Sequence, residues 1–154
     1  MVIREAFGRP VLPEMKGLVD PVTAADLEAE AAIIEVLSRN RPGDAVLGEE
    51  GGGQTESRGR RWIIDPLDGT VNFVHQIPHV AVSIGLWDGD QPLVGVVVDV
   101  MRGEIFQAVR GEGAFLNGQR IKVSSGARLK ECLVATGFPY DRHINGPAYS
   151  QVAG

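Results

Sequence analysis

The stretch that decides the fold runs from Arg61 to Phe73 and reads Arg-Trp-Ile-Ile-Asp-Pro-Leu-Asp-Gly-Thr-Val-Asn-Phe. Its apolar part, residues 62–64, has the bulky and β-branched character of a buried strand. We expect this strand to end at Asp65, because Pro66 lacks the N–H group that a continuing ladder would need. Gly69-Thr70 then supplies a flexible turn and a helix-capping side chain. The stretch predicts a strand, an acidic turn and the start of a helix.

Asp65 and Asp68 are expected to lie close together at the end of that strand. Two carboxylates about 4 Å apart repel each other by roughly 4 kcal/mol at an effective dielectric constant of about 20, and a divalent cation removes this repulsion. Oxygen ligands favour Mg²⁺ over Zn²⁺. The amides of Gly69 and Thr70 would add a site for an anion such as phosphate. Asp-Pro or Asp-Gly alone is an ordinary turn signal, so the prediction depends on their combination.

Five motifs follow one another along the chain and are spread over nearly its whole length. They are residues 22–26 (Val-Thr-Ala-Ala-Asp), 48–50 (Gly-Glu-Glu), 65–73, 111–118 (Gly-Glu-Gly-Ala-Phe-Leu-Asn-Gly) and 135–140 (Ala-Thr-Gly-Phe-Pro-Tyr). In sequence and order these motifs resemble the inositol monophosphatase family, within the lithium-sensitive, Mg²⁺-dependent phosphatase superfamily. The resemblance implies an α/β fold, an α+β layered sandwich in which an antiparallel or mixed sheet is flanked by helices.

The resemblance also implies a set of metal ligands. One Mg²⁺ ion would be held by Glu49, Asp65 and the backbone carbonyl of Leu67, and Asp65 would bridge to a second ion held by Asp68. Glu50 lies next to this set, and its role stays open.

The catalytic residues implied by the resemblance are Glu49, which would help to activate water, and Thr70, which would be supported by a hydrogen bond with Asp26. The amides of Gly69 and Thr70 would bind the substrate phosphate. Asp26 also has a structural role open to it, because it stands three residues after Thr23, as in a capping box. Lys16 stands near a position where the family often has a lysine close to the metals.

Composition bounds the remaining possibilities. The chain has 44% hydrophobic and 23% charged residues, as a soluble globular domain has. Its net charge of -5 argues against nucleic acid as the main ligand. A single cysteine, Cys132, leaves no intrachain disulfide and fits a reducing compartment. Without a long apolar run or a leader-like start, we expect a cytoplasmic protein with no membrane partner.

Hydrophobic periodicity gives the expected elements. Residues 23–39 predict an amphipathic helix on which Leu27, Ala31, Ile34 and Leu37 repeat at helical spacing. A short strand is expected at residues 45–48, followed by a Gly-rich loop at residues 51–59. An antiparallel meander is then expected, with strands at residues 80–87, 93–100, 104–109, 114–116 and 120–123 and a hairpin turn at residues 117–118.

We expect residues 1–125 to form the metal- and phosphate-binding α+β domain, and residues 126–154 to begin a second α/β half with a strand at residues 129–138. The resemblance implies that this chain has a shortened N-terminus and lacks the C-terminal half. That half would supply a further metal-binding aspartate and most contacts to the alcohol part of the substrate.

Three functions remain open. The first is Mg²⁺-dependent hydrolysis of a small phosphorylated polyol, with inositol monophosphate as the leading substrate and histidinol-phosphate or bisphosphonucleotide phosphatase as alternatives. The second is a catalytically incomplete metal-binding fragment. The third is a protein-interaction module, since a relative in the family also acts through protein partners in transcription. The resemblance further suggests a homodimer and inhibition by Li⁺.

Overall fold

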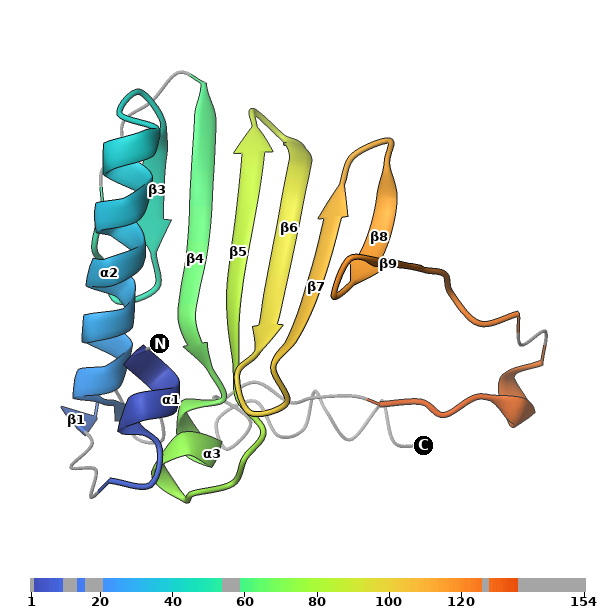
Figure 1. Cartoon of the computed structure of the whole chain (residues 1–154), viewed down its shortest axis with the longest axis horizontal. Coiled ribbons are helices and arrows are strands. Elements are labelled where there is room, and N and C mark those ends of the chain that lie inside the picture. Colours follow the sequence, from blue (N-terminus) through green and yellow to red (C-terminus); the bar gives the residue numbers. More distant parts are fainter. Residues whose placement is uncertain (1, 10–13, 16–20, 54–58, 126–127, 136–154) are drawn as a thin grey trace, which may run out of the picture.

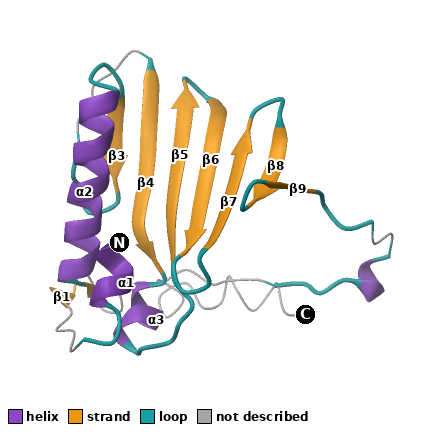
Figure 2. Ribbon diagram, viewed as in Figure 1, coloured by secondary structure: helices purple, strands orange, loops and turns teal. Residues whose placement is uncertain are grey.

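A computed structural model of the chain describes residues 2–9, 14–15, 21–53, 59–125 and 128–135 (Figure 1). Its elements, in chain order, are α1 Val2–Ala6, β1 Glu14–Met15, β2 Pro21–Val22, α2 Ala24–Asn40, β3 Ala45–Gly48, β4 Arg60–Asp68, α3 Thr70–Val74, β5 Ala81–Asp88, β6 Gln91–Asp99, β7 Glu104–Val109, β8 Gly113–Leu116, β9 Gln119–Ile121 and a 3₁₀ turn at Leu129–Glu131. The α/β class expected from the sequence is confirmed, with helices beside a seven-stranded mixed sheet (Figure 2) and a separate two-stranded antiparallel sheet formed by β1 and β2.

The large sheet has seven strands in the order β3-β4-β5-β6-β7-β8-β9. β3 pairs in parallel with β4, and every later neighbour is antiparallel. The predicted meander is therefore confirmed. The hairpin at Asn117 and Gly118 is confirmed as well, with φ angles of 48° and 79° that suit a tight turn.

Helix α2 is the long helix expected from the sequence, and Thr23 caps it. The capping box is complete: the Thr23 hydroxyl accepts the N–H of Ala25 at 3.2 Å, and the Thr23 N–H donates to the Asp26 carboxylate at 2.9 Å. The helix runs along the edge of the sheet beside β3 and β4 (Figure 1). Helix α2 therefore supports the residues at the ends of β3 and β4.

The buried face of α2 is not the one that the apolar repeat indicated. Leu27 is 53% exposed and Ala31 is exposed, whereas the buried positions are Ala25, Asp26, Ala29 and Glu30. Alanines let the helix approach the sheet closely, and the two acids can be buried because backbone N–H groups and hydroxyls bind them. The prediction of the helix was correct and the prediction of its inner face was wrong.

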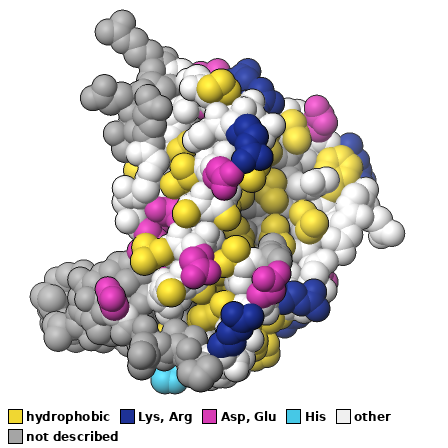
Figure 3. Space-filling view, turned by 60° about the vertical axis from the view of Figure 1, so that its left-hand side comes forward, with side chains coloured by type: hydrophobic (Ala, Val, Ile, Leu, Met, Phe, Trp, Pro, Cys, Tyr) yellow, Lys and Arg dark blue, Asp and Glu magenta, His cyan; other side chains and the backbone are white. Residues whose placement is uncertain are grey.

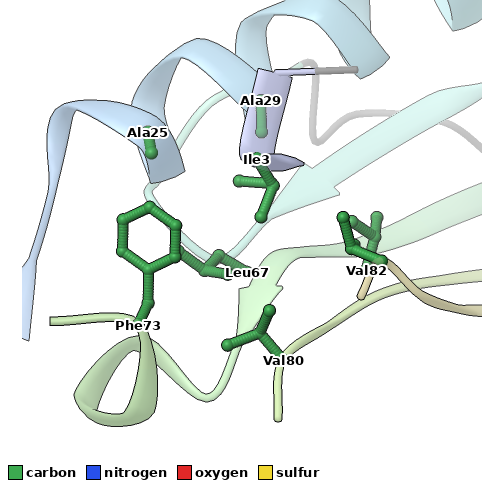
Figure 4. Close-up of a cluster of buried hydrophobic side chains, with 8 residues drawn as sticks. Ile3, Ala25, Ala29, Leu67, Phe73, Val80 and Val82 are labelled. Carbon is green, nitrogen blue, oxygen red and sulfur yellow. The ribbon is translucent and has the colours of Figure 1, made fainter. Parts of the chain in front are cut away.

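The core joins α1, α2, the end of β4, α3 and β5 in one cluster (Figure 4). Phe73 of α3 is fully buried, and its ring meets Phe7 edge to face at a centroid distance of 5.7 Å. Ile3, Leu67 and Val80 complete the contact around it. The short helix α3 is thus anchored by its phenylalanine, which fixes the turn just before it.

Strand β4 does not end at Asp65 as we expected. It continues to Asp68, which pairs with Ala81, and the register with β5 shifts between Asp65 and Asp68. Pro66 does interrupt the ladder, because it has no N–H to donate, but the chain bulges and then pairs again. The acidic segment is therefore an irregular part of a strand and not a separate turn.

The strand predicted at residues 129–138 is wrong for the part that the structure describes. Leu129–Glu131 is a 3₁₀ turn, and Leu133 and Val134 are 100% and 69% exposed. Residues 136–138 lie outside the described residues, as do most of the motif at 135–140 and Lys16. No helix among the described residues is long and apolar enough to cross a membrane.

The α2 side of the molecule carries scattered charges of both signs, with hydrophobic side chains between them (Figure 3). Among the described side chains drawn on this face, no broad basic surface is visible.

Candidate functional site

The centre of the site is the bulged end of β4. Asp65 is partly buried, Leu67 is 2% exposed and Asp68 is exposed. The Leu67 N–H donates to Oδ1 of Asp65 at 3.1 Å, a local turn that becomes possible because Pro66 has released the strand from its regular ladder. The irregularity thus orients the Asp65 carboxyl group with respect to its own backbone.

Glu49 reaches this centre from the neighbouring parallel strand. β3 ends at Gly48, which is in register with Ile64, and the N–H of Glu49 donates to the Ile64 carbonyl at 3.1 Å. Glu49, the first residue after β3, is therefore held beside Ile64, which directly precedes Asp65 in β4. Parallel pairing brings Glu49 and Asp65 together although they are far apart in the sequence.

The surroundings of Asp65 disfavour its charge. Burial, followed by the charge of Glu49, a hydrogen bond with Glu49 and the charge of Asp68, raises the pKa of Asp65 from 3.8 to about 7. The hydrogen bond from the Leu67 N–H acts in the opposite direction. A carboxyl group in such a position is a candidate for a functional site, because a bound cation would stabilise the charged form.

Asp26 and Thr70 form a second part of the site. Oδ1 of Asp26 accepts the Thr70 hydroxyl at 3.1 Å, and Oδ2 accepts the Thr23 hydroxyl at 2.5 Å. The Thr70 oxygen is also 3.1 Å from the Leu67 carbonyl oxygen. A hydroxyl has one proton, so it donates fully to only one of these two acceptors at a time. The hydrogen bond between Asp26 and Thr70 that the resemblance implied is present.

Gly69 occupies a position that only glycine suits. Its φ of 91° lies in the left-handed region, and an added Cβ would stand 2.9 Å from the His79 carbonyl oxygen. The same oxygen accepts the side-chain amide of Asn72 at 2.9 Å. The turn before α3 is therefore closely packed, and the first N–H groups of α3, beginning with Thr70, have no partner within the helix.

The site gathers its groups only in part. Asp65 interacts with both Glu49 and Asp68, but among the residues that the structure describes no three His, Cys, Asp or Glu side chains converge closely enough to form a complete metal cluster. The Glu50 N–H donates to the Glu30 carboxylate at 2.8 Å, so its backbone is part of the loop's support. The available donors are oxygens, the kind that hard cations select.

Glu30 is the residue that sequence reasoning missed. It is 4% exposed and binds the loop that carries Glu49. A signal was present, because Glu30 follows Asp26 by four residues and lies on the same face of the helix. Two acids one turn apart, each directly after a buried alanine (Ala25 and Ala29), indicate a polar network inside the helix contact.

Fold and site together define a class: an α/β protein with a carboxylate-rich, oxygen-donor site at the ends of two adjacent strands. The chain belongs to the inositol monophosphatase family, whose model matches residues 1–151. Phosphatases that are generally metal-dependent make up this family, which agrees with the oxygen donors of the site.

Three comparisons illustrate the relationship. The chain is 50% identical to an inositol-1-monophosphatase of Synechocystis over 80% of its own length and 43% of that protein. It is 45% identical to the Nus factor SuhB of Haemophilus influenzae over 86% of its length and 50% of that protein. It is also similar to the crystal structure of the suppressor protein suhB of Bartonella henselae, with a TM-score of 0.88, 38% identity, and coverage of 97% of this chain and 60% of that one. This chain thus spans about half the length of the curated relatives.

Proposed function

We propose that this protein hydrolyses a small phosphate monoester to the alcohol and inorganic phosphate in a reaction that depends on Mg²⁺. The observation that carries the proposal is the meeting of Glu49 with Asp65, whose charge is disfavoured without a cation, beside the hydrogen-bonded pair Asp26 and Thr70. Uncatalysed hydrolysis of phosphate monoesters is extremely slow, so a site for this reaction must stabilise negative charge and position water.

Although their side chains do not converge into a complete cluster in the part of the chain that the structure describes, the donor atoms of the residues present fit a hard divalent cation. Glu49, Asp65, Asp68 and the Leu67 carbonyl would hold it, and they offer only oxygen donors. The Leu67 carbonyl oxygen has two lone pairs. It can therefore accept a hydrogen bond from the Thr70 hydroxyl with one and bind a cation with the other. Bound Mg²⁺ would supply charge neutralisation and a lower pKa for a bound water. The raised pKa of Asp65 supports this assignment, since the charged carboxylate becomes favourable once a cation is near.

Thr70 is proposed to orient the attacking water. When its proton points to Oδ1 of Asp26, the lone pairs of its oxygen are free to accept a hydrogen bond from water. Asp26 is well suited to hold Thr70 as a carboxylate, because it also accepts the N–H and the hydroxyl of Thr23. Thr70 would thus accept the proton of the attacking water, and Glu49 is a second candidate for this base.

The phosphate group is proposed to bind at the start of α3. The amides of Gly69 and Thr70 precede the first helical hydrogen bonds and can donate to phosphate oxygens. The left-handed conformation of Gly69 lets the backbone make the sharp turn from β4 into the helix. Core packing of Phe73 would keep these donors in place.

Inositol monophosphate is the leading substrate class, because the Synechocystis relative at 50% identity is an inositol-1-monophosphatase. A histidinol-phosphate or bisphosphonucleotide substrate is the alternative for the same chemistry. We place the protein in the cytoplasm, as a homodimer that Li⁺ inhibits.

The test is phosphate release from inositol, histidinol, sugar and nucleotide phosphates, with MgCl₂ or EDTA. Asp68→Asn should abolish release, whereas Asp90→Asn, which alters an exposed acid in the turn between β5 and β6, should leave it unchanged. Turnover that requires Mg²⁺ and Asp68 would support the proposal and identify the substrate branch. A folded chain that releases no phosphate under any condition would show that these residues are not a working enzyme by themselves.

A second candidate is a role in a protein complex. It is favoured by the similarity to the Nus factor SuhB of Haemophilus influenzae. In that case the acidic residues would serve as surface contacts, and a function of the chain in transcription would survive Asp68→Asn. Loss of that function in Asp68→Asn together with loss of phosphate release would favour the enzyme.

A further inference from the structure

Glu30 is a buried acid for which the proposed reaction has no use. Only 4% of the residue is exposed, and of the ion pairs between described residues none involves it. A buried carboxylate must be compensated by hydrogen bonds, and here the compensation comes from the loop after β3. Oε2 accepts the N–H of Glu50 at 2.8 Å, and Oε1 accepts the N–H of Gly52 at 2.9 Å.

The loop is shaped to receive this carboxylate. A Cβ added at Gly48 would stand 2.2 Å from Oε2 of Glu30, and one added at Gly52 would stand 2.4 Å from Oε1. The loop also closes on itself, since the Gly48 N–H donates to the Gly52 carbonyl at 3.0 Å. The two glycines therefore provide the space that the Glu30 carboxylate fills.

Glu49 lies inside the segment that Glu30 holds. Its own N–H donates to the Ile64 carbonyl, and the next N–H, that of Glu50, donates to Glu30. The N–H groups of Glu50 and Gly52 already donate to Glu30, so they are not available to donate to the carboxylate of Glu49. The Glu49 side chain is left to interact with Asp65.

The same helix holds the other part of the site. Asp26, one turn before Glu30, accepts the Thr70 hydroxyl at 3.1 Å. Residues four apart lie on one face of a helix, so α2 presents one acid to the start of α3 and the next to the loop after β3. The relative placement of Thr70 and Glu49 is thus set by one rigid element.

We propose that Glu30 is a positioning residue, which fixes the Glu49 loop against α2 and thereby sets the affinity of the site for a divalent cation. The proposal rests on the proposed function, because Glu49 is taken as a metal ligand. Residues that orient metal ligands from behind typically change metal affinity by about 10- to 100-fold when they are replaced.

The test is calorimetric titration of the full chain with MgCl₂ alone. Glu30→Gln keeps the size of the side chain but turns an NH₂ group toward one of the two N–H donors. We expect its Kd for Mg²⁺ to rise about tenfold or more. Hydrogen exchange at the Glu50 and Gly52 amides should accelerate as well. Glu28→Gln is the matched control, since it removes an exposed acid from the same helix, and its Kd should equal that of the wild type.

A second pair of variants tests the same contact from the side of the loop. Gly52→Ala pushes a Cβ toward Oε1 of Glu30 without removing charge, and it should also weaken Mg²⁺ binding. Gly43→Ala is its control, because no heavy atom of the described residues, its chain neighbours aside, lies within 4 Å of the added Cβ. This pair decides the question if Glu30→Gln does not fold.

The outcomes separate the two proposals. Folded Glu30→Gln or Gly52→Ala that binds Mg²⁺ within about twofold of the wild type, even with a lower Tm, would overturn the positioning role and leave the proposed function intact. A wild-type chain without saturable Mg²⁺ binding, or with binding that Asp65→Asn does not weaken, would overturn both.

Discussion

At Asp65 the chain keeps a carboxyl group where its charge is unfavourable. Burial and the neighbouring acids Glu49 and Asp68 raise its pKa to about 7, although an asparagine would fit the same space without a charge. A carboxyl group kept at such a cost is what we expect at a functional site, and it agrees with the proposed role of Asp65 as a ligand of a cation.

The first prediction concerns the stability of the chain in EDTA. Between about pH 4 and pH 7 the folded state keeps a proton on Asp65 that the unfolded state has lost, so the free energy of unfolding falls as the pH rises through this window. A shift of this size corresponds to at most about 4 kcal/mol, and we expect roughly half because the group is partly exposed.

Urea unfolding of the wild type and of Asp65→Asn at several pH values measures this effect. The free energy of unfolding of Asp65→Asn should not fall in this way as the pH rises. The variant should therefore be more stable than the wild type at pH 8 in EDTA. Parallel pH profiles for the two proteins would contradict the prediction. Adding Mg²⁺ at pH 8 should raise the Tm of the wild type and not that of Asp65→Asn.

The second prediction concerns Thr70. Its hydroxyl donates to Asp26 at 3.1 Å, and it is proposed to accept a hydrogen bond from the attacking water. Thr70→Ala should lower kcat for phosphate release by about 10²- to 10⁴-fold, the usual contribution of a positioned proton acceptor. Thr70→Ser keeps the hydroxyl and should retain most of the activity. Equal losses in both variants would show that the methyl group, and not the hydroxyl, matters.

Among the elements, α2 depends most clearly on a single residue outside it. Thr23 is 3% exposed, caps the helix and donates its hydroxyl to Asp26 at 2.5 Å. Thr23→Ala should lower the free energy of unfolding by about 1–2 kcal/mol. Thr23→Ser should recover most of this loss, and urea unfolding of the three proteins compares them. A Thr23→Ser chain as unstable as Thr23→Ala would argue that methyl packing, and not the cap, stabilises the helix.

The elements were largely predictable because their signals are local. Helix α2 has its cap and acid three residues apart, and the turn at Asn117-Gly118 has the residues that a tight hairpin needs. The inner face of α2 was not predictable from apolar spacing, because Glu30 is buried through hydrogen bonds from N–H groups that lie 20 and 22 residues further along the chain. The spacing of Asp26 and Glu30 indicates a polar contact on this face, but a single sequence does not identify the tertiary partners that make the burial of Glu30 possible.

The continuation of β4 past Pro66 has a similar explanation. Proline predicts a break locally, and a break in register is present. Pairing resumes at Asp68 because Ala81 lies opposite it, after α3 and the following loop have brought the chain back to the sheet as β5. Of the candidate site, the motifs gave the residues Asp26, Glu49, Asp65 and Thr70, but not the loop support from Glu30.

In the whole molecule, the sheet is covered unevenly. Helix α2 lies beside β3 and β4, whereas β7 and β9 are mostly exposed, including Ile105 at 44%, Phe106 at 36% and Val109 at 37%. The chain spans about half the length of its curated relatives. Exposed apolar strands next to an open edge favour association between chains.

The last prediction follows from the open edge at β9. Ile121 is 37% exposed in this strand, which among the described strands pairs with β8 alone. Ile121→Lys places a charge where a second strand would pair, so it should lower the apparent mass of the chain at high concentration. Val123→Lys adds the same charge at a 96% exposed position beyond the strand, and it should change association little. Light scattering coupled to size exclusion, over a range of concentrations, compares the three proteins. If both lysines reduce association equally, net charge and not edge pairing controls it, and a monomeric wild type at every concentration would exclude association through this edge.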